Sequence, residues 1–128
     1  MDELYVDQLL SRPVETVAPN TPIPEAAATL IEHDVGAVVV VDDADRTVGL
    51  LTATDVVALV RDGTAAAGVT VADRMRTDVI TTTRDALVAD VADTMVDNLI
   101  HHVPVVDGDD VVGMITTFDL TAYLARTL

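Results

Sequence analysis

A seven-residue pattern occurs twice in this chain, and the duplication is the feature that most restricts its possible folds. GLLTATD spans residues 49–55, and GMITTFD spans residues 113–119, 64 positions later. Each copy contains a Gly, two apolar residues and a Thr, followed three residues later by an Asp. Internal self-similarity indicates that one structural unit has been duplicated.

The similarity extends far beyond the short pattern. Residues 15–60 align with residues 80–124, with an offset of 65 up to Asp42 and Asp107 and of 64 afterwards. The offset changes within an acidic turn, where a duplicated fold tolerates a difference in length. The alignment predicts a first repeat over residues 1–62, a linker over 63–69 and a second repeat over 70–128.

Each half predicts the same order of elements, with an amphipathic turn, an extended piece, a helix, two strands joined by an acidic turn, and a final helix. The turns are expected at 6–10 and 71–75, the extended pieces at 14–17 and 79–82, the strands at 37–41, 48–51, 102–106 and 111–115, and the final helices at 55–60 and 119–126. The buried helix faces are expected to carry Ala26, Ala27, Leu30 and Ile31 in the first half, and Val88, Val91, Ala92, Met95 and Val96 in the second.

This order predicts an α+β fold made of two β-α-β-β-α repeats. A three-stranded sheet with helices on one face leaves its other face uncovered. We therefore expect the two repeats to pack sheet to sheet around a pseudo-two-fold axis.

The charge of the chain argues against several classes of partner. There are 22 acidic residues, seven basic residues and a formal net charge of −15. Nucleic acids and anionic membranes require basic patches, so neither is an expected partner. All the bases are Arg and the acids are distributed along the chain, a composition typical of salt-accumulating archaea. With no long apolar run and no cysteine, a cytoplasmic location is expected.

The repeated Thr-x-x-Asp has two interpretations. Thr52 with Asp55, and Thr116 with Asp119, suit the start of a helix, where hydroxyl and carboxylate oxygens cap free backbone N–H groups. The same geometry suits a nucleoside. A helix N-terminus attracts an anion, and a carboxylate accepts hydrogen bonds from a ribose diol. The glycine that begins each copy could be explained by the backbone conformation of a turn.

The duplicated pattern, preceded each time by the same helix, strand and acidic turn, resembles a tandem of cystathionine-β-synthase (CBS) domains, or Bateman module, over about residues 6–60 and 70–125. The resemblance implies a regulatory module that senses an adenosine-containing ligand (AMP, ADP, ATP or S-adenosylmethionine) in a cleft between the repeats, with no required cofactor. It also implies a disc-like homodimer that acts on an effector protein still to be identified.

The resemblance also implies roles for individual residues. Asp55 and Asp119 would accept hydrogen bonds from ribose, and Thr52 and Thr116 would contact ribose or phosphate. The positions that would border or read the adenine base are Thr16 and Thr81 on the extended pieces, and Ala37, Val38, His102, Val103 and Pro104 at the central strands.

The chain departs from many nucleotide-binding members of this family before the central strands. Asp34 and Leu99 occupy positions where such members carry a basic residue. Phosphate would therefore depend on Arg12, Arg76 or a helix N-terminus. Together with the negative charge, this favours a monophosphate or the sulfonium of S-adenosylmethionine over a triphosphate.

Neither a metal site nor an enzyme is predicted. Neighbouring side chains at a strand entry, such as His101 and His102, point to opposite faces, so a metal site there is not expected. No nucleophile or nucleotide-hydrolysis motif occurs, so no catalytic residue and no enzyme activity are predicted. The rival to a sensor is a ligand-free dimerisation and interaction scaffold in which the Thr-x-x-Asp pairs act only as helix caps.

Overall fold

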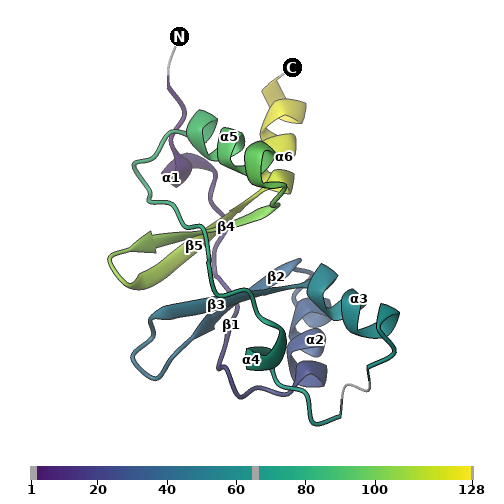
Figure 1. Cartoon of the computed structure of the whole chain (residues 1–128). Coiled ribbons are helices and arrows are strands. Elements are labelled where there is room, and N and C mark those ends of the chain that lie inside the picture. Colours follow the sequence, from purple (N-terminus) through teal and green to yellow (C-terminus); the bar gives the residue numbers. More distant parts are fainter. Residues whose placement is uncertain (1–2, 65–66, 128) are drawn as a thin grey trace. The chain divides into compact units, whose positions relative to one another are not determined.

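The computed structural model describes residues 3–64 and 67–127, which form two compact units (Figure 1). Unit 1 comprises Met1–Val14 with Ile80–Leu128, and unit 2 comprises Glu15–Val79. Both units combine helices with strands, which confirms the predicted α+β class. The sheet-to-sheet packing of the repeats stays a prediction. Within the described residues, no helix is long and apolar enough to cross a membrane.

Unit 2 contains one three-stranded sheet with three helices. Its elements are β1 (Thr16–Val17), α2 (Ile23–Glu32), β2 (Ala37–Val41), β3 (Thr47–Thr52), α3 (Ala53–Arg61) and α4 (Val71–Arg74). The strand order is β1-β2-β3, with β1 parallel and β3 antiparallel to β2. Pro24 lies in the first turn of α2, where its missing N–H costs no helical hydrogen bond.

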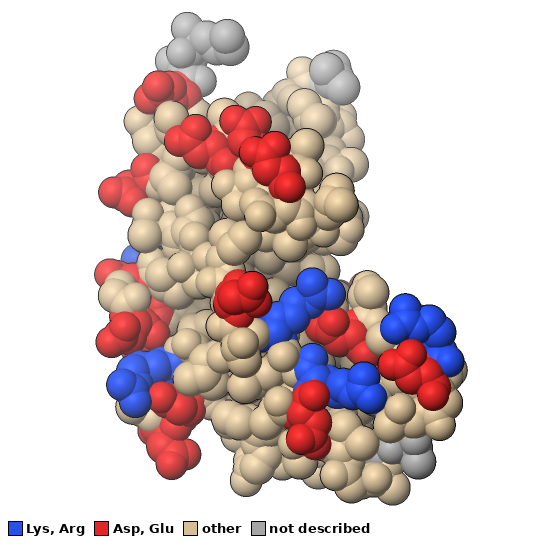
Figure 2. All heavy atoms as spheres, viewed as in Figure 1, with Lys and Arg blue, Asp and Glu red and all other residues tan. Residues whose placement is uncertain are grey.

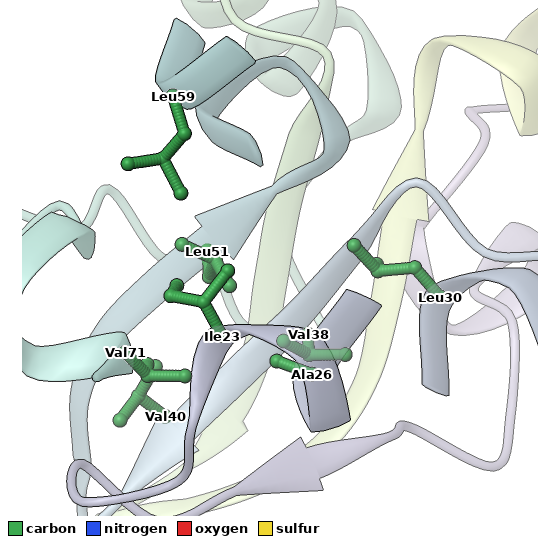
Figure 3. Close-up of a cluster of buried hydrophobic side chains, with 8 residues drawn as sticks. All are labelled: Ile23, Ala26, Leu30, Val38, Val40, Leu51, Leu59 and Val71. Atoms are coloured by element: carbon green, nitrogen blue, oxygen red, sulfur yellow. The ribbon is translucent and has the colours of Figure 1, made fainter. Parts of the chain in front are cut away.

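The core of unit 2 lies between the sheet and its helices (Figure 3). Alternate positions of β2 face this core, as a strand periodicity of two requires. The buried members of the cluster are Ile23, Ala26, Leu30, Val38, Val40, Leu51, Leu59 and Val71. Val71 belongs to α4, so the beginning of the second repeat completes the core around the first.

Unit 1 has the equivalent arrangement, but its sheet contains two strands. Its elements are α1 (Val6–Leu9), α5 (Val88–Asn98), β4 (His102–Asp107), β5 (Asp110–Thr116) and α6 (Thr117–Thr127). The extended piece predicted at 79–82 forms only an isolated parallel bridge from Thr82 to Val105. The buried core consists of Val6, Val88, Val91, Met95, Val103, Val105 and Ile115.

The compact units do not coincide with the sequence repeats. The predicted boundaries at 1–62, 63–69 and 70–128 follow the repeats, whereas the units divide the chain after Val14 and after Val79. Each repeat therefore gives its leading segment to the unit that holds the body of the other repeat. Alignment identifies equivalent segments but does not say which core each one joins. Residues 65–66 of the predicted linker, and residues 1–2 and 128 of the repeats, lie outside the described residues.

One part of the predicted helix faces is wrong in both repeats. Ile31 and Val96 are 81% and 72% exposed, although we expected them to be buried. The buried stripe of α2 follows Ile23, Ala26 and Leu30. Ile31 follows Leu30 and is rotated by about 100° around the helix axis, which turns it away from the sheet. The final helices also begin two residues earlier than predicted, because Thr52 and Thr116 cap them directly.

Candidate functional site

The first Thr-x-x-Asp lies where β3 ends and α3 begins in unit 2. Thr52 Oγ1 accepts a hydrogen bond from the Asp55 backbone N–H at 3.2 Å, and Asp55 Oδ2 accepts one from the Thr52 N–H at 2.9 Å. This is a capping box, which satisfies two backbone donors at the helix start. The capping interpretation therefore describes the geometry of this junction.

The second Thr-x-x-Asp has the same geometry where β5 meets α6 in unit 1. The Asp119 N–H donates to Thr116 Oγ1 at 3.2 Å, and the Thr116 N–H donates to Asp119 Oδ2 at 2.9 Å. Both carboxylates are partly buried. The repeated pattern thus produces two locally identical strand-to-helix junctions.

Each junction lies beside the first residue of its central strand. Ala37 pairs with Thr52, and His102 pairs with Thr116. The backbone preceding the strand also caps the helix, because the Ala53 N–H donates to Gly36 O at 2.9 Å. The predicted base-reading backbone and the predicted ribose-binding residues are therefore neighbours within each unit.

The other predicted base-bordering residues differ in exposure. Val38, Val103 and Pro104 are buried, whereas Thr16 and Thr81 are exposed. Thr16 lies on β1 opposite Val39 of β2, so the extended piece does run beside the central strand in unit 2. The roles of these residues toward a ligand stay predictions.

The glycine of each repeated pattern makes room for a crossing segment. A Cβ on Gly49 would lie 2.5 Å from Met75 Sδ and 3.1 Å from Arg76 O. A Cβ on Gly113 would lie 2.6 Å from Leu10 Cδ1 and 3.3 Å from Ser11 O. Both glycines are buried within strands. Close approach of another chain segment, and not turn chemistry, explains why Gly stands at these positions.

The segment that crosses Gly49 brings a guanidinium to Asp55. Leu50 and Arg76 exchange two backbone hydrogen bonds of 2.9 Å. The Arg76 side chain then reaches Asp55 Oδ1 with Nη2 at 3.1 Å and Nε at 3.3 Å. The Asp55 side chain is only 14% exposed, so solvent screens this pair less than an ordinary surface pair.

The segment that crosses Gly113 brings a hydroxyl to Asp119. Met114 and Ser11 exchange two backbone hydrogen bonds, of 2.8 and 3.1 Å. Ser11 Oγ donates to Asp119 Oδ1 at 2.8 Å. Ser11 and Arg76 are equivalent in the repeat, at an offset of 65. Ser11 was not among the predicted site residues, although the offset of 65 relates it to Arg76, which was.

The two arginines considered for phosphate have carboxylate partners in the structure. Arg76 contacts Asp55, as described above, and Arg12 Nη2 lies 3.5 Å from Asp7 Oδ1 on the surface. Six of the seven arginines take part in such ion pairs. In Figure 2 the acidic side chains are spread over the visible face, and basic side chains adjoin them. The described surface therefore offers little unpaired positive charge to a polyphosphate.

His102 pairs with Thr116 at the second junction, and its imidazole is partly buried. Burial lowers the pKa of its imidazole, the neighbouring His101 lowers it further, and the Asp119 carboxylate raises it. The neutral imidazole is thus the favoured form near pH 7. Within the described residues, no group of three or more metal-ligating side chains gathers around a common point.

Comparison with known proteins accounts for the duplicated unit. The sequence profile of the CBS domain matches residues 6–62 and 71–126. An uncharacterized 17.7 kDa protein of Acidianus ambivalens is 32% identical over 120 residues, which cover 93% of this chain and 72% of the relative. The uncharacterized protein MJ1404 of Methanocaldococcus jannaschii is 33% identical over 138 residues, which cover 98% of this chain and 33% of MJ1404. Some relatives are therefore much longer than this chain.

A solved structure supports the same assignment. The CBS domain pair of protein MJ0100, crystallised with 5′-methylthioadenosine and S-adenosyl-L-methionine, is 31% identical. The superposition covers 99% of this chain and 100% of that chain, with a TM-score of 0.92. The sequence match, the two capped strand-to-helix junctions and the structural similarity agree, and the chain belongs to the CBS domain family as a pair of CBS repeats.

Proposed function

We propose that this chain is a regulatory module that binds an adenosine-containing ligand through its Thr-x-x-Asp junctions. The observation that carries the proposal is the capped carboxylate, held beside the first residue of the central strand in each unit. Capping fixes the orientation of the carboxylate before a ligand arrives, which reduces the entropy lost on binding. The ligands in the crystal structure of the MJ0100 domain pair are both adenosine derivatives, which supports this class.

The charge of the chain favours ligands that carry little negative charge. Each unit is acidic, and most arginines already contact a carboxylate. A triphosphate would meet repulsion that AMP meets to a lesser degree and that cationic S-adenosylmethionine does not meet. We therefore expect S-adenosylmethionine, 5′-methylthioadenosine and AMP to bind more tightly than ADP or ATP.

Calorimetric titration with these five compounds tests the proposal. In the double variant Asp55→Asn with Asp119→Asn, we expect binding to fall at least tenfold, or about 1.4 kcal/mol. Asparagine keeps one oxygen for the cap but replaces the other carboxylate oxygen with a donor. A matched control is Asp43→Asn with Asp109→Asn, which changes the net charge equally at two exposed turn residues.

The rival function is a scaffold that binds no nucleotide. It is favoured by one observation, namely that the hydrogen bonds between the Thr and the Asp of each Thr-x-x-Asp form a helix cap. If none of the five compounds binds or raises the melting temperature, while the Asp variants still lower stability, the sensor proposal is wrong and the scaffold stands. We assign no catalytic role under either function.

We also propose that the module acts as a homodimer that passes its signal to an effector protein. Both units expose apolar side chains at equivalent helix positions, namely Ile31 and Val60 in unit 2, and Val96 and Leu124 in unit 1. Exposed apolar groups of this kind commonly mark an interface. Sedimentation equilibrium should give twice the chain mass, and the variant Ile31→Glu with Val96→Glu should sediment as a monomer. A monomeric parent protein would contradict the proposal.

A further inference from the structure

The two junctions have different capacities to accept hydrogen bonds. An ionised carboxylate has about four lone-pair positions. Asp55 accepts from three N–H groups within its unit, and one of them, Arg76 Nε–H, is shared between the two carboxylate oxygens. Thr52 N lies 2.9 Å from Oδ2, Arg76 Nη2 lies 3.1 Å from Oδ1, and Arg76 Nε lies 3.3 and 3.5 Å from the two oxygens. A ribose diol at Asp55 would have to displace the guanidinium.

Asp119 retains more acceptor capacity. Within unit 1, its described polar contacts are the Thr116 N–H on Oδ2 and the Ser11 hydroxyl on Oδ1. About two lone-pair positions remain, which matches the two hydroxyls of a vicinal diol. Ser11 can also rotate its hydroxyl and accept a hydrogen bond from a ligand, whereas a guanidinium can only donate.

The charge around the two carboxylates differs in the same direction. Arg76 neutralises Asp55, whereas the groups around Asp119 are uncharged near pH 7, because Ser11 is a hydroxyl and burial keeps His102 in its neutral form. Only Asp119 therefore keeps a net negative charge at its junction. That charge favours hydroxyl donors and a cationic ligand such as S-adenosylmethionine.

We infer that the two junctions are unequal, and that a single ligand binds each chain with its ribose on Asp119 while Arg76 closes the Asp55 junction. This inference rests on the proposed function, since it states which of two equivalent junctions the ligand uses. Ser11 and Arg76 are then the residues that determine occupancy. Each is supplied by the leading segment of the repeat whose junction it does not contact.

Calorimetry with S-adenosylmethionine and with AMP on the full chain tests the inference through stoichiometry. The parent protein should bind about one ligand per chain, because one carboxylate has free acceptor positions. Asp119→Asn should lower affinity at least tenfold. Asp55→Asn should change affinity by less than about twofold, because no ligand contacts that carboxylate.

Exchanging the two determining residues provides the sharper test. Arg76→Ser gives the Asp55 junction the partner that Asp119 has, and should raise the stoichiometry to about two. Ser11→Arg gives the Asp119 junction an arginine and should abolish binding. Melting temperatures without ligand show whether each variant folds. Asp119→Asn keeps the test decisive if Ser11→Arg does not fold.

Several outcomes would overturn the inference. The parent protein could bind two ligands per chain, or Asp55→Asn could lower affinity more than Asp119→Asn does. Arg76→Ser could also leave the stoichiometry at one. Each of these results would show that Arg76 does not close the Asp55 junction. In these cases the proposed function survives, because a ligand still binds. Absence of binding by the parent protein to every adenosine compound contradicts the proposed function itself.

Discussion

The junctions at Asp55 and Asp119 share a pattern, a backbone geometry and a capping box, but they differ in what crosses the neighbouring glycine. Met75 and Arg76 cross Gly49, whereas Leu10 and Ser11 cross Gly113. One aspartate therefore joins an ion pair and the other accepts a neutral hydroxyl. Duplication preserved the local motif, and divergence at one position of the crossing segment gave its two copies different electrostatic surroundings.

The exchange of leading segments places each differing residue beside the junction of the other repeat. Val6 of the first repeat is fully buried in unit 1, and Val71 of the second is fully buried in unit 2. A substitution in one repeat thus changes the site built on the other repeat. Substitutions at equivalent positions test how far the two units are equivalent.

Truncation of the core should affect both units strongly. Leu51 and Ile115 are equivalent strand residues with no exposed surface. Leu51→Ala and Ile115→Ala should each lower the free energy of unfolding by about 2–5 kcal/mol, because each leaves a cavity between sheet and helices. Urea unfolding followed by circular dichroism measures the loss.

The same series shows whether the units unfold together. Two separate transitions, with each variant shifting only one of them, would mean that the units are independently stable. Asp43→Ala and Asp109→Ala are controls at exposed turn positions outside the proposed dimer face, and should cost less than about 0.5 kcal/mol. A loss below 1 kcal/mol at Leu51 or Ile115 would contradict the described cores.

Adding a methyl group at the crossing glycines should have the next largest effect. Gly49→Ala and Gly113→Ala force a Cβ against Met75 and Leu10, and should cost about 1–3 kcal/mol of overpacking. We expect the Gly49 variant to lose more, since Arg76 O lies 3.1 Å from the added atom, compared with 3.3 Å for Ser11 O. Equal stability of the parent and both variants would mean that the crossing segments do not pack as described.

Removal of the cap hydroxyls should cost less, and by similar amounts in the two units. Thr52→Ala and Thr116→Ala each remove the acceptor of one backbone N–H, a loss of about 0.5–2 kcal/mol. Thr→Ser at the same positions keeps the hydroxyl and should restore most of the stability. Thermal unfolding of the four variants checks this. A difference above about 1 kcal/mol between the Ala variants would show that the caps are not equivalent.

The smallest expected effect is a pH dependence confined to unit 1. The pKa of His102 is lower in the folded protein than its usual value near 6.5, so the unfolded chain binds the proton more readily. His102 therefore contributes stability above about pH 6.5, and this contribution is lost as the pH falls through the lowered value. Its equivalent in unit 2 is Ala37, which does not titrate.

Urea unfolding between pH 5 and 8 should thus show a shallower decline toward acid in His102→Gln than in the parent protein. Identical profiles for the parent and His102→Gln would show that protonation of His102 does not destabilise the folded protein.

The repeat, the α+β class, the family and most elements can be predicted from the amino-acid sequence alone. Apolar runs such as AVVVV, and a Thr placed three residues before an Asp, act through local physical effects that hold in any surroundings. Such features allowed β2 to be predicted over its observed range, and both capped helices to be placed within two residues of their observed starts. Ile31 and Val96 were misplaced because periodicity shows that a helix has an apolar side, but not how much of that side the sheet covers.

The partners of the two aspartates depend on how the whole chain packs. The pairs of Asp55 with Arg76 and of Asp119 with Ser11 join residues 21 and 108 positions apart, across the boundary of a repeat. Local sequence preferences do not encode which core a leading segment enters, because α1 and α4 offer similar apolar faces to both. That choice depends on packing of the whole chain, and it made two identical motifs into two different sites.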